Sequence, residues 1–192
     1  MNVTAHVTAV NPTTGHFFMQ DESGGPWSGI YVNVKICEFS DISCVSSADG
    51  KLLSPDYYIN RGTAWVVEVL GTIMEINGTT ALSSVSNIRY IRNDTMPAPT
   101  VITTGSIGYN CSSLGEAYES VLVKYLNTSI MSNVNAKDEI ALDDGSGIAE
   151  LDNSFYNGAG HLTSLYGSEL KGQTLLYLVG IIIYSSDNNN YD

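Results

Sequence analysis

The residues that could carry out chemistry are few and lie far apart in the sequence. The three histidines, His6, His16 and His161, show no His-x-x-x-His spacing, and the three cysteines form no Cys-x-x-Cys motif. Metal sites built on these residues need such spacings. The serines lack the Gly-x-Ser-x-Gly motif of a nucleophile elbow. We therefore expect the chain to have no enzymatic activity of its own.

Two short acidic segments offer the best alternative chemistry. Asp143 and Asp144 begin the segment Asp-Asp-Gly-Ser-Gly, and Asp21 begins the similar segment Asp-Glu-Ser-Gly. Their oxygens are ligands that Ca²⁺ accepts. The same residue types also make turns between strands, and no further carboxylates stand at calcium-loop spacing. We favour the turn and expect no cofactor, with Ca²⁺ at Asp143 and Asp144 as the weaker alternative.

The charge balance argues against two classes of partner. Of 192 residues, 20 are acidic and eight are Lys or Arg, which gives a net charge of −12. Binding to nucleic acid depends on cations that neutralise phosphates, so a nucleic-acid partner is not expected, and neither is an anionic membrane surface. The longest apolar run, Leu175–Tyr184, is about half of what a membrane-spanning helix needs. We expect a central strand there and no membrane span.

Glycosylation motifs and cysteines together favour an extracellular or cell-surface protein. Asn-x-Ser/Thr occurs at Asn2, Asn77, Asn93, Asn110 and Asn127. N-linked glycans are expected first at Asn93, Asn110 and Asn127, which are predicted in the linker and in loops. Asn77 has a competing role as a turn residue before a glycine.

The cysteines support the same compartment. Cys37 and Cys44 flank a short polar segment and are expected to form a disulfide in an oxidising environment. Cys111 is left over, either as a free thiol or as the site of an intermolecular bond. No signal peptide precedes the first strand, so we expect a mature product or a fragment.

The chain repeats itself. Strands are expected over 2–10, 16–22, 29–36, 63–76 and 80–91, and again over 119–132, 138–144, 147–152 and 173–185, from alternating β-branched and aromatic residues. Gly71 and Gly180 interrupt the two long apolar strands at matching places, where we expect bends. A short helix is expected over 160–170. After Tyr184 the second copy lacks the hairpin and strand with which the first copy ends.

This order predicts an all-β protein made of two tandem oligonucleotide/oligosaccharide-binding (OB)-like Greek-key barrels. We expect the first domain over 1–91 and a linker rich in Pro, Thr, Ser and Gly over 92–115. The second domain then covers 116–192, includes the short helix, and has a last strand that is short or missing.

Four motifs give this prediction a family resemblance. They are Gly-x-Phe-Phe-x-Gln-Asp (15–21), Gly-x-x-x-Glu-x-Asn-Gly-Thr-Thr-x-Leu (71–82), Met-Pro-Ala-Pro (96–99) and Glu-x-Tyr-Glu-x-x-Leu-Val (116–123). In this order they resemble the tandem OB-like domains beside nuclease domains in bacterial secreted nucleases and multidomain surface proteins. The resemblance implies no catalytic residue here, because the chemistry of those proteins belongs to a separate nuclease domain.

A binding function is the alternative to a structural one. Phe17, Phe18, Trp27 and Tyr31 are candidate base-stacking residues, but Lys35 is almost the only basic residue near them. Trp27, Tyr57 and Tyr58 could instead support carbohydrate. The chain would then be an accessory module of a larger secreted enzyme or surface protein.

We favour a secreted structural protein that self-assembles into an extracellular filament by pairing strands between subunits. The candidate assembly edge is the last long strand, with its apolar residues Leu175, Tyr177, Val179, Ile181 and Ile183. Three explanations of the missing strand remain open: the tail forms a short strand, the chain is a fragment, or a neighbouring subunit donates a strand. The donor would be Met1–Val10 or the linker around 97–104, and deletion of residues 1–8 is expected to leave the first barrel folded.

Overall fold

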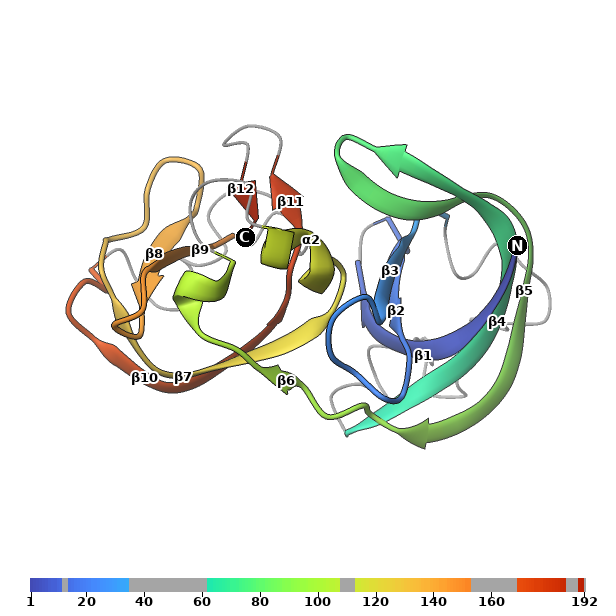
Figure 1. Cartoon of the computed structure of the whole chain (residues 1–192), viewed down its shortest axis with the longest axis horizontal. Helices are drawn as coiled ribbons and strands as arrows, with labels where there is room; N and C mark the ends of the chain where they lie inside the picture. The colour runs from blue at the N-terminus through green and yellow to red at the C-terminus, as the bar shows by residue number, and fades with distance from the viewer. Residues whose placement is uncertain (12–13, 35–61, 108–112, 153–168, 186–189, 192) are drawn as a thin grey trace, which may run out of the picture.

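The computed structural model describes residues 1–11, 14–34, 62–107, 113–152, 169–185 and 190–191. The described part is mostly β-structure, with a closed barrel in the first half and a second sheet in the other half (Figure 1). The strands are β1 (Asn2–Val10), β2 (Phe17–Gln20), β3 (Gly29–Val32), β4 (Thr63–Ile76), β5 (Thr79–Thr95), β6 (Thr100–Val101), β7 (Leu122–Ile130), β8 (Ile140–Asp143), β9 (Ile148–Leu151), β10 (Thr174–Ile181), β11 (Tyr184–Ser185) and β12 (Asn190–Tyr191). The helical segments are η2 (Thr104–Ser106) and α2 (Ser113–Tyr118).

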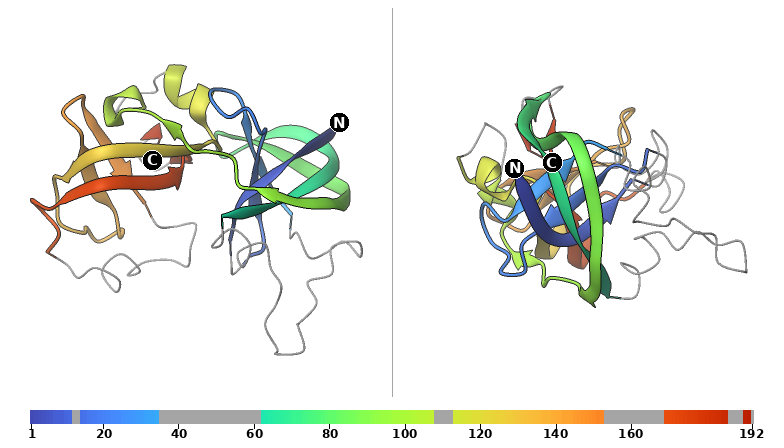
Figure 2. Two further views of the ribbon diagram at one scale, coloured as in Figure 1. Left: turned by 90° about the horizontal axis from the view of Figure 1, so that it is seen from below. Right: turned by 90° about the vertical axis from the view of Figure 1, so that its right-hand side faces the viewer.

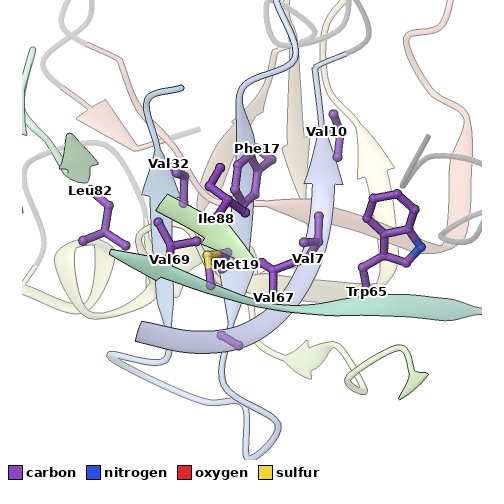
Figure 3. Close-up of a cluster of buried hydrophobic side chains, with 11 residues drawn as sticks. Val7, Val10, Phe17, Met19, Val32, Trp65, Val67, Val69, Leu82 and Ile88 are labelled. Carbon is purple, nitrogen blue, oxygen red and sulfur yellow. The ribbon is translucent and has the colours of Figure 1, made fainter. Parts of the chain in front are cut away.

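The first half closes on itself in the order β1-β2-β3-β5-β4. β3 and β5 run parallel, and the other neighbours are antiparallel. Alternate residues point inward and form one continuous core, which Figure 3 shows. Phe17, Met19, Val67, Val69 and Ile88 are among its fully buried members. The predicted first barrel is therefore present.

A long hairpin of β4 and β5 completes this barrel and projects from it (Figure 1). Its turn is Asn77–Gly78, and both residues have positive φ (53° and 85°), as a tight two-residue hairpin turn requires. The pairing of β4 with β5 shifts register between Leu70 and Thr72. Gly71 lies at this shift, so the β4–β5 pairing is irregular at the place where a bend was predicted.

The second sheet has the order β10-β7-β8-β9, and β6 also pairs with β7, in parallel. Among the described residues this sheet does not close into a barrel. The prediction of two tandem barrels is thus confirmed for the mostly-β class and for one closed barrel only. β10 stays in continuous register with β7 through Gly180. The bend predicted at Gly180 is absent from this pairing, because the shift at Gly71 arises against β5, and no described strand takes that place beside β10.

The core of the second half is divided. One cluster contains Val121, Val123 and Tyr125, and another contains Ile130, Ile140 and Leu142. Leu178 of β10 packs against both clusters but stays only partly buried. In the first barrel, β5 contributes Ile88 to the single core, and Val85 of β5 packs against that core. The second half lacks such a contribution among its described residues.

The two halves are joined by direct contacts as well as by the chain. The side-chain carbonyl of Gln20 accepts a hydrogen bond from the Leu122 amide (2.6 Å), and the Glu119 carboxylate accepts one from the Thr80 amide (2.8 Å). Gly78, at the hairpin tip, lies against the ring of Tyr184, so close that an added Cβ would be 2.4 Å from ring atoms. Figures 1 and 2 show the hairpin reaching toward β11.

The segment between the halves is more structured than predicted. β5 extends to Thr95, and β6, η2 and α2 follow within or just beyond the predicted linker. The predicted helix over 160–170 lies almost wholly outside the described residues. Cys37, Cys44 and Cys111 also lie outside them, so the disulfide stays a prediction. No helix in the described ranges is both long and apolar enough to cross a membrane.

Candidate assembly site on the second sheet

The acidic segments form matching turns. At the β2–β3 turn, Oδ1 of Asp21 accepts hydrogen bonds from the amide (2.9 Å) and hydroxyl (2.6 Å) of Ser23. At the β8–β9 turn, Oδ1 of Asp144 accepts the same pair from Ser146, at 3.1 and 2.5 Å. Asp143 accepts hydrogen bonds from the amides of Gly145 and Gly147. These contacts are those of the predicted turns, repeated in both halves.

Asp144 also holds η2 to this turn through hydrogen bonds from the amide and hydroxyl of Thr104 (3.1 and 2.9 Å). Burial raises the pKa of Asp144, but the hydrogen bonds from Ser146 and Thr104 outweigh it, so that its pKa lies below the usual value. The described ranges contain no group of three or more His, Cys, Asp or Glu side chains placed to hold a metal ion. Ca²⁺ binding at Asp143 and Asp144 stays an untested alternative.

The other candidate side chains lie apart. His6 is buried in β1 with its Nε2 3.6 Å from Asp94, whereas Nδ1 of His16 lies 2.8 Å from the Tyr31 hydroxyl. Phe17 and Phe18 are buried, so they cannot serve as exposed stacking platforms for bases. Trp27 is exposed, while Tyr57, Tyr58 and His161 lie outside the described residues, and a carbohydrate site stays a prediction.

The asparagines of the four described glycosylation motifs are all exposed: Asn2, Asn77, Asn93 and Asn127. Asn93 lies on β5 and Asn127 on β7, so the reason given for their priority, a loop or linker position, is wrong. Asn110 lies outside the described residues. Exposure agrees with glycosylation at the four sites but ranks none above another.

The most unusual feature is the outer edge of β10, which we call the β10 edge. β10 pairs with β7 from Thr174 to Ile181, and no described strand pairs with its other side. β9, at the opposite end of the same sheet, pairs with β8 and with no other described strand. In the first barrel, the matching strands β4 and β3 both pair with β5, which lies between them. Among its described strands, the second sheet therefore has a gap where the first has β5.

Side chains along the β10 edge are unusually exposed for their type. Leu176, Tyr177 and Val179 are exposed by 78%, 61% and 42%. When Gly180 is aligned with Gly71, Leu176 corresponds to Val67, which is completely buried in the first barrel. An unpaired apolar strand edge invites pairing with another chain. This edge lies along the rim of the second sheet beside β7 (Figure 2, left).

Gly71 and Gly180, which occupy the aligned position in the two halves, differ in the same way as the strands that contain them. A Cβ added to Gly71 would lie 3.0 Å from the carbonyl oxygen of Ser83 and 3.3 Å from Cγ2 of Val85, both on β5. A Cβ added to Gly180 would have no heavy atom of the described residues within 4 Å. No described residue fills at Gly180 the space that β5 fills in the first half.

The five predicted edge residues have different surroundings, and their role in assembly stays a prediction. Leu175 is partly buried and packs on the second core cluster, and Tyr177 and Val179 are exposed. Ile181 ends β10, and Ile183 lies beyond it. The prediction missed Leu176, the most exposed of the group. The signal for Leu176 was available, because its aligned counterpart Val67 faces the first core.

Both predicted donor segments are engaged within their own chain. β1 pairs with β4 along Asn2–His6 and with β2 along His6–Val10, and Val7 belongs to the barrel core. In the linker, β6 pairs with β7, and Ile102 is buried in the second half. Donation of either segment would break these contacts.

The C-terminal tail does form a short strand, which was one of the three explanations offered for the missing strand. β12 pairs with β11 through Tyr184↔Tyr191 and Ser185↔Asn190, not with β10. A comparison with protein-family models and with curated proteins finds no match to this chain.

Proposed function

We propose that this chain is a non-catalytic, secreted structural protein that self-assembles into filaments by pairing strands between subunits, with the β10 edge as acceptor. The observation that carries this proposal is that no described strand pairs with the outer side of β10, and that no described atom lies near Gly180, whereas Gly71 faces β5. Strand addition to such an edge gains backbone hydrogen bonds and pockets for alternate side chains.

We take the partner to be a second copy of the chain. The first half of the chain already contains a strand, β5, in the position that is vacant among the described strands of the second sheet. The order of the first barrel is compatible with an OB-like fold, and we propose that the second sheet, whose described strands have the order β10-β7-β8-β9, completes a similar arrangement when a fifth strand is added. An incoming strand would pair with the β10 edge and shield Leu176 and Leu178, as β5 shields Val67 and Val69. It would also join the two core clusters that Leu178 touches.

Secretion and N-glycosylation complete the proposal. The exposed asparagines of four Asn-x-Ser/Thr motifs support glycosylation. The acidic surface, with a net charge of −12, would weaken association at low ionic strength and keep free subunits soluble.

The test is a pair of lysine substitutions at aligned positions. Val179→Lys places a charge on the β10 edge, where burial by a partner strand would be costly. Leu70→Lys is the matched control, because Leu70 aligns with Val179 and is equally exposed (44%), but β4 is paired there on both sides. We expect sedimentation and electron microscopy to show filaments for wild type and Leu70→Lys and none for Val179→Lys. A wild-type chain that stays monomeric at high concentration would exclude the function.

A further inference from the structure

A filament requires two different complementary surfaces on every subunit, and the structure contains a second unpaired strand edge. β4 pairs with β1 as far as Leu70, and Met1 extends this pairing through two backbone hydrogen bonds with Gly71 (2.6 and 3.0 Å). Beyond Gly71, residues 72–76 pair with β5 on one side only, and no described strand lies on the other. We call this stretch the hairpin edge; it lies in the green hairpin of Figure 1.

The hairpin edge also exposes apolar side chains. Ile73 and Met74 are exposed by 48% and 45%. Neighbouring residues of a strand point to opposite faces, so the subunit leaves both faces of this edge incompletely covered. Pairing with another strand would cover both faces and satisfy the free backbone groups.

We propose that the β10 edge of one copy pairs, antiparallel, with the hairpin edge of a second copy. This inference rests on the proposed function and identifies the partner surface. Antiparallel pairing is slightly more stable per residue than parallel pairing, and it repeats the relation of β5 to β4 in the first barrel.

The side chains fix a register. Leu176 and Leu178 share one face of β10, and Met74 and Ile76 share one face of β4. Pairing Leu178 with Met74 and Leu176 with Ile76 of the second copy brings these faces together. Met74 of the second copy then covers Leu178, beside both core clusters that Leu178 contacts.

Charge supports the same register on the other face. There Tyr177 is opposite Glu75 of the second copy, and Nζ of Lys124 lies 4.6 Å from the centre of the Tyr177 ring. Glu75 is exposed, and its Oε1 accepts a hydrogen bond from the Thr80 hydroxyl (2.7 Å). The contact therefore brings a cation to a carboxylate. Pairing two β10 edges would instead bring two copies of Lys124 together, which disfavours that alternative.

The two edges are different surfaces, so each contact leaves one free edge of each kind at the ends. Such a head-to-tail contact propagates into an open filament unless its rotation closes a ring. Pairing of two identical edges would stop at a dimer.

Complementary blocking variants test this contact. Leu176→Lys blocks the β10 edge and keeps the hairpin edge, whereas Met74→Lys does the reverse. Each variant alone should sediment as a monomer, because it lacks one of the two surfaces. An equimolar mixture should form 1:1 dimers and nothing longer, since one intact edge of each kind remains. Leu114→Lys is the control and should polymerise, because Leu114 is a half-exposed residue of α2 and lies on neither edge.

The outcomes separate this inference from the proposed function. If Met74→Lys assembles like wild type while Leu176→Lys does not, the hairpin edge is not the partner, but assembly at the β10 edge stands. A wild-type chain that never assembles removes both. As a check of register, Lys124→Glu and Glu75→Lys should each raise the critical concentration roughly fivefold, and the double variant should restore it. A double variant no better than the single ones overturns the register.

Discussion

At the scale of single residues, the most instructive comparison is between Gly71 and Gly180. Each lies in a long apolar strand with an antiparallel partner on one side. Only Gly71 has β5 on the other side, and the atoms of Ser83 and Val85 leave little space for a side chain. Contacts with β5 explain why position 71 is a glycine, whereas no described residue of the subunit requires a glycine at position 180.

This difference predicts opposite effects of alanine. Gly71→Ala should lower the free energy of unfolding by about 1–3 kcal/mol, because Cβ would crowd β5 in a well-packed region. Gly180→Ala should leave the stability of the monomer unchanged or raise it by about 0.4–1 kcal/mol, since the unfolded chain loses freedom. Urea unfolding of non-assembling Leu176→Lys chains carrying each substitution measures both. Equal losses would show that the space beside Gly180 is filled.

At the scale of elements, β1 shows why an exposed end of the chain is not a free strand. The alternation of apolar residues over 2–10 predicted the strand correctly. The same alternation places Val7 in the core. β1 pairs with β4 along its first half and with β2 along its second half. Sequence pattern defines which face is buried but not which neighbours fill the edges.

Deletion of residues 1–8 should therefore unfold the first barrel, contrary to the expectation from sequence. It removes the pairing partner of β4 and two core residues, Ala5 and Val7. We expect the near-ultraviolet circular dichroism of Trp65, buried in the same core, to be lost. Truncation of residues 190–192, which include only the short β12, is the control and should preserve it. A deletion variant with an intact Trp65 signal would restore β1 as a possible donor.

Sequence pattern defines local structure but not long-range neighbours, and this explains which elements were predicted well and which poorly. Long strands such as β4 and β10 and the Asp-x-Ser turns depend on local pattern, and they were found. α2 is six residues long, too short for a periodic signal, and its position depends on contacts with the first barrel. The backbone of Trp27, for example, donates a hydrogen bond to the Ala117 carbonyl at 2.5 Å. The open β10 edge was predictable only because the first half provided an internal template.

At the scale of the whole molecule, the two halves meet around a buried carboxyl group. Oε2 of Glu119 accepts the Thr80 amide from the β4–β5 hairpin (2.8 Å). Oε1 is buried and has no hydrogen-bond partner in the described part of the chain. The pKa of Glu119 is raised to about 7, chiefly by burial; the hydrogen bonds from Thr80 lower it, and the neighbouring carboxylates Glu116 and Glu75 raise it.

The junction should consequently weaken as the pH rises. The folded state holds the Glu119 proton more tightly than the unfolded chain, whose ordinary value is 4.5. The stability due to this group is therefore complete below pH 4.5 and is lost as the pH rises through about 7. The full change corresponds to roughly 3 kcal/mol. Glu119→Gln retains an acceptor for the Thr80 amide but cannot ionise, so its stability should not fall over this range.

Urea unfolding of the non-assembling Leu176→Lys chain between pH 4.5 and 8.5, with and without Glu119→Gln, measures the effect. Glu22→Gln is the matched control, because Glu22 is an exposed glutamate on the β2–β3 turn, and it should keep the parent's pH dependence. Since the hairpin that Glu119 holds also carries the hairpin edge, ionisation should loosen that edge relative to the second sheet. Assembly of the otherwise wild-type chain should then weaken above pH 7, and Glu119→Gln should abolish this decline. A parent chain and a Glu119→Gln variant with identical pH profiles would show that Glu119 does not control the junction.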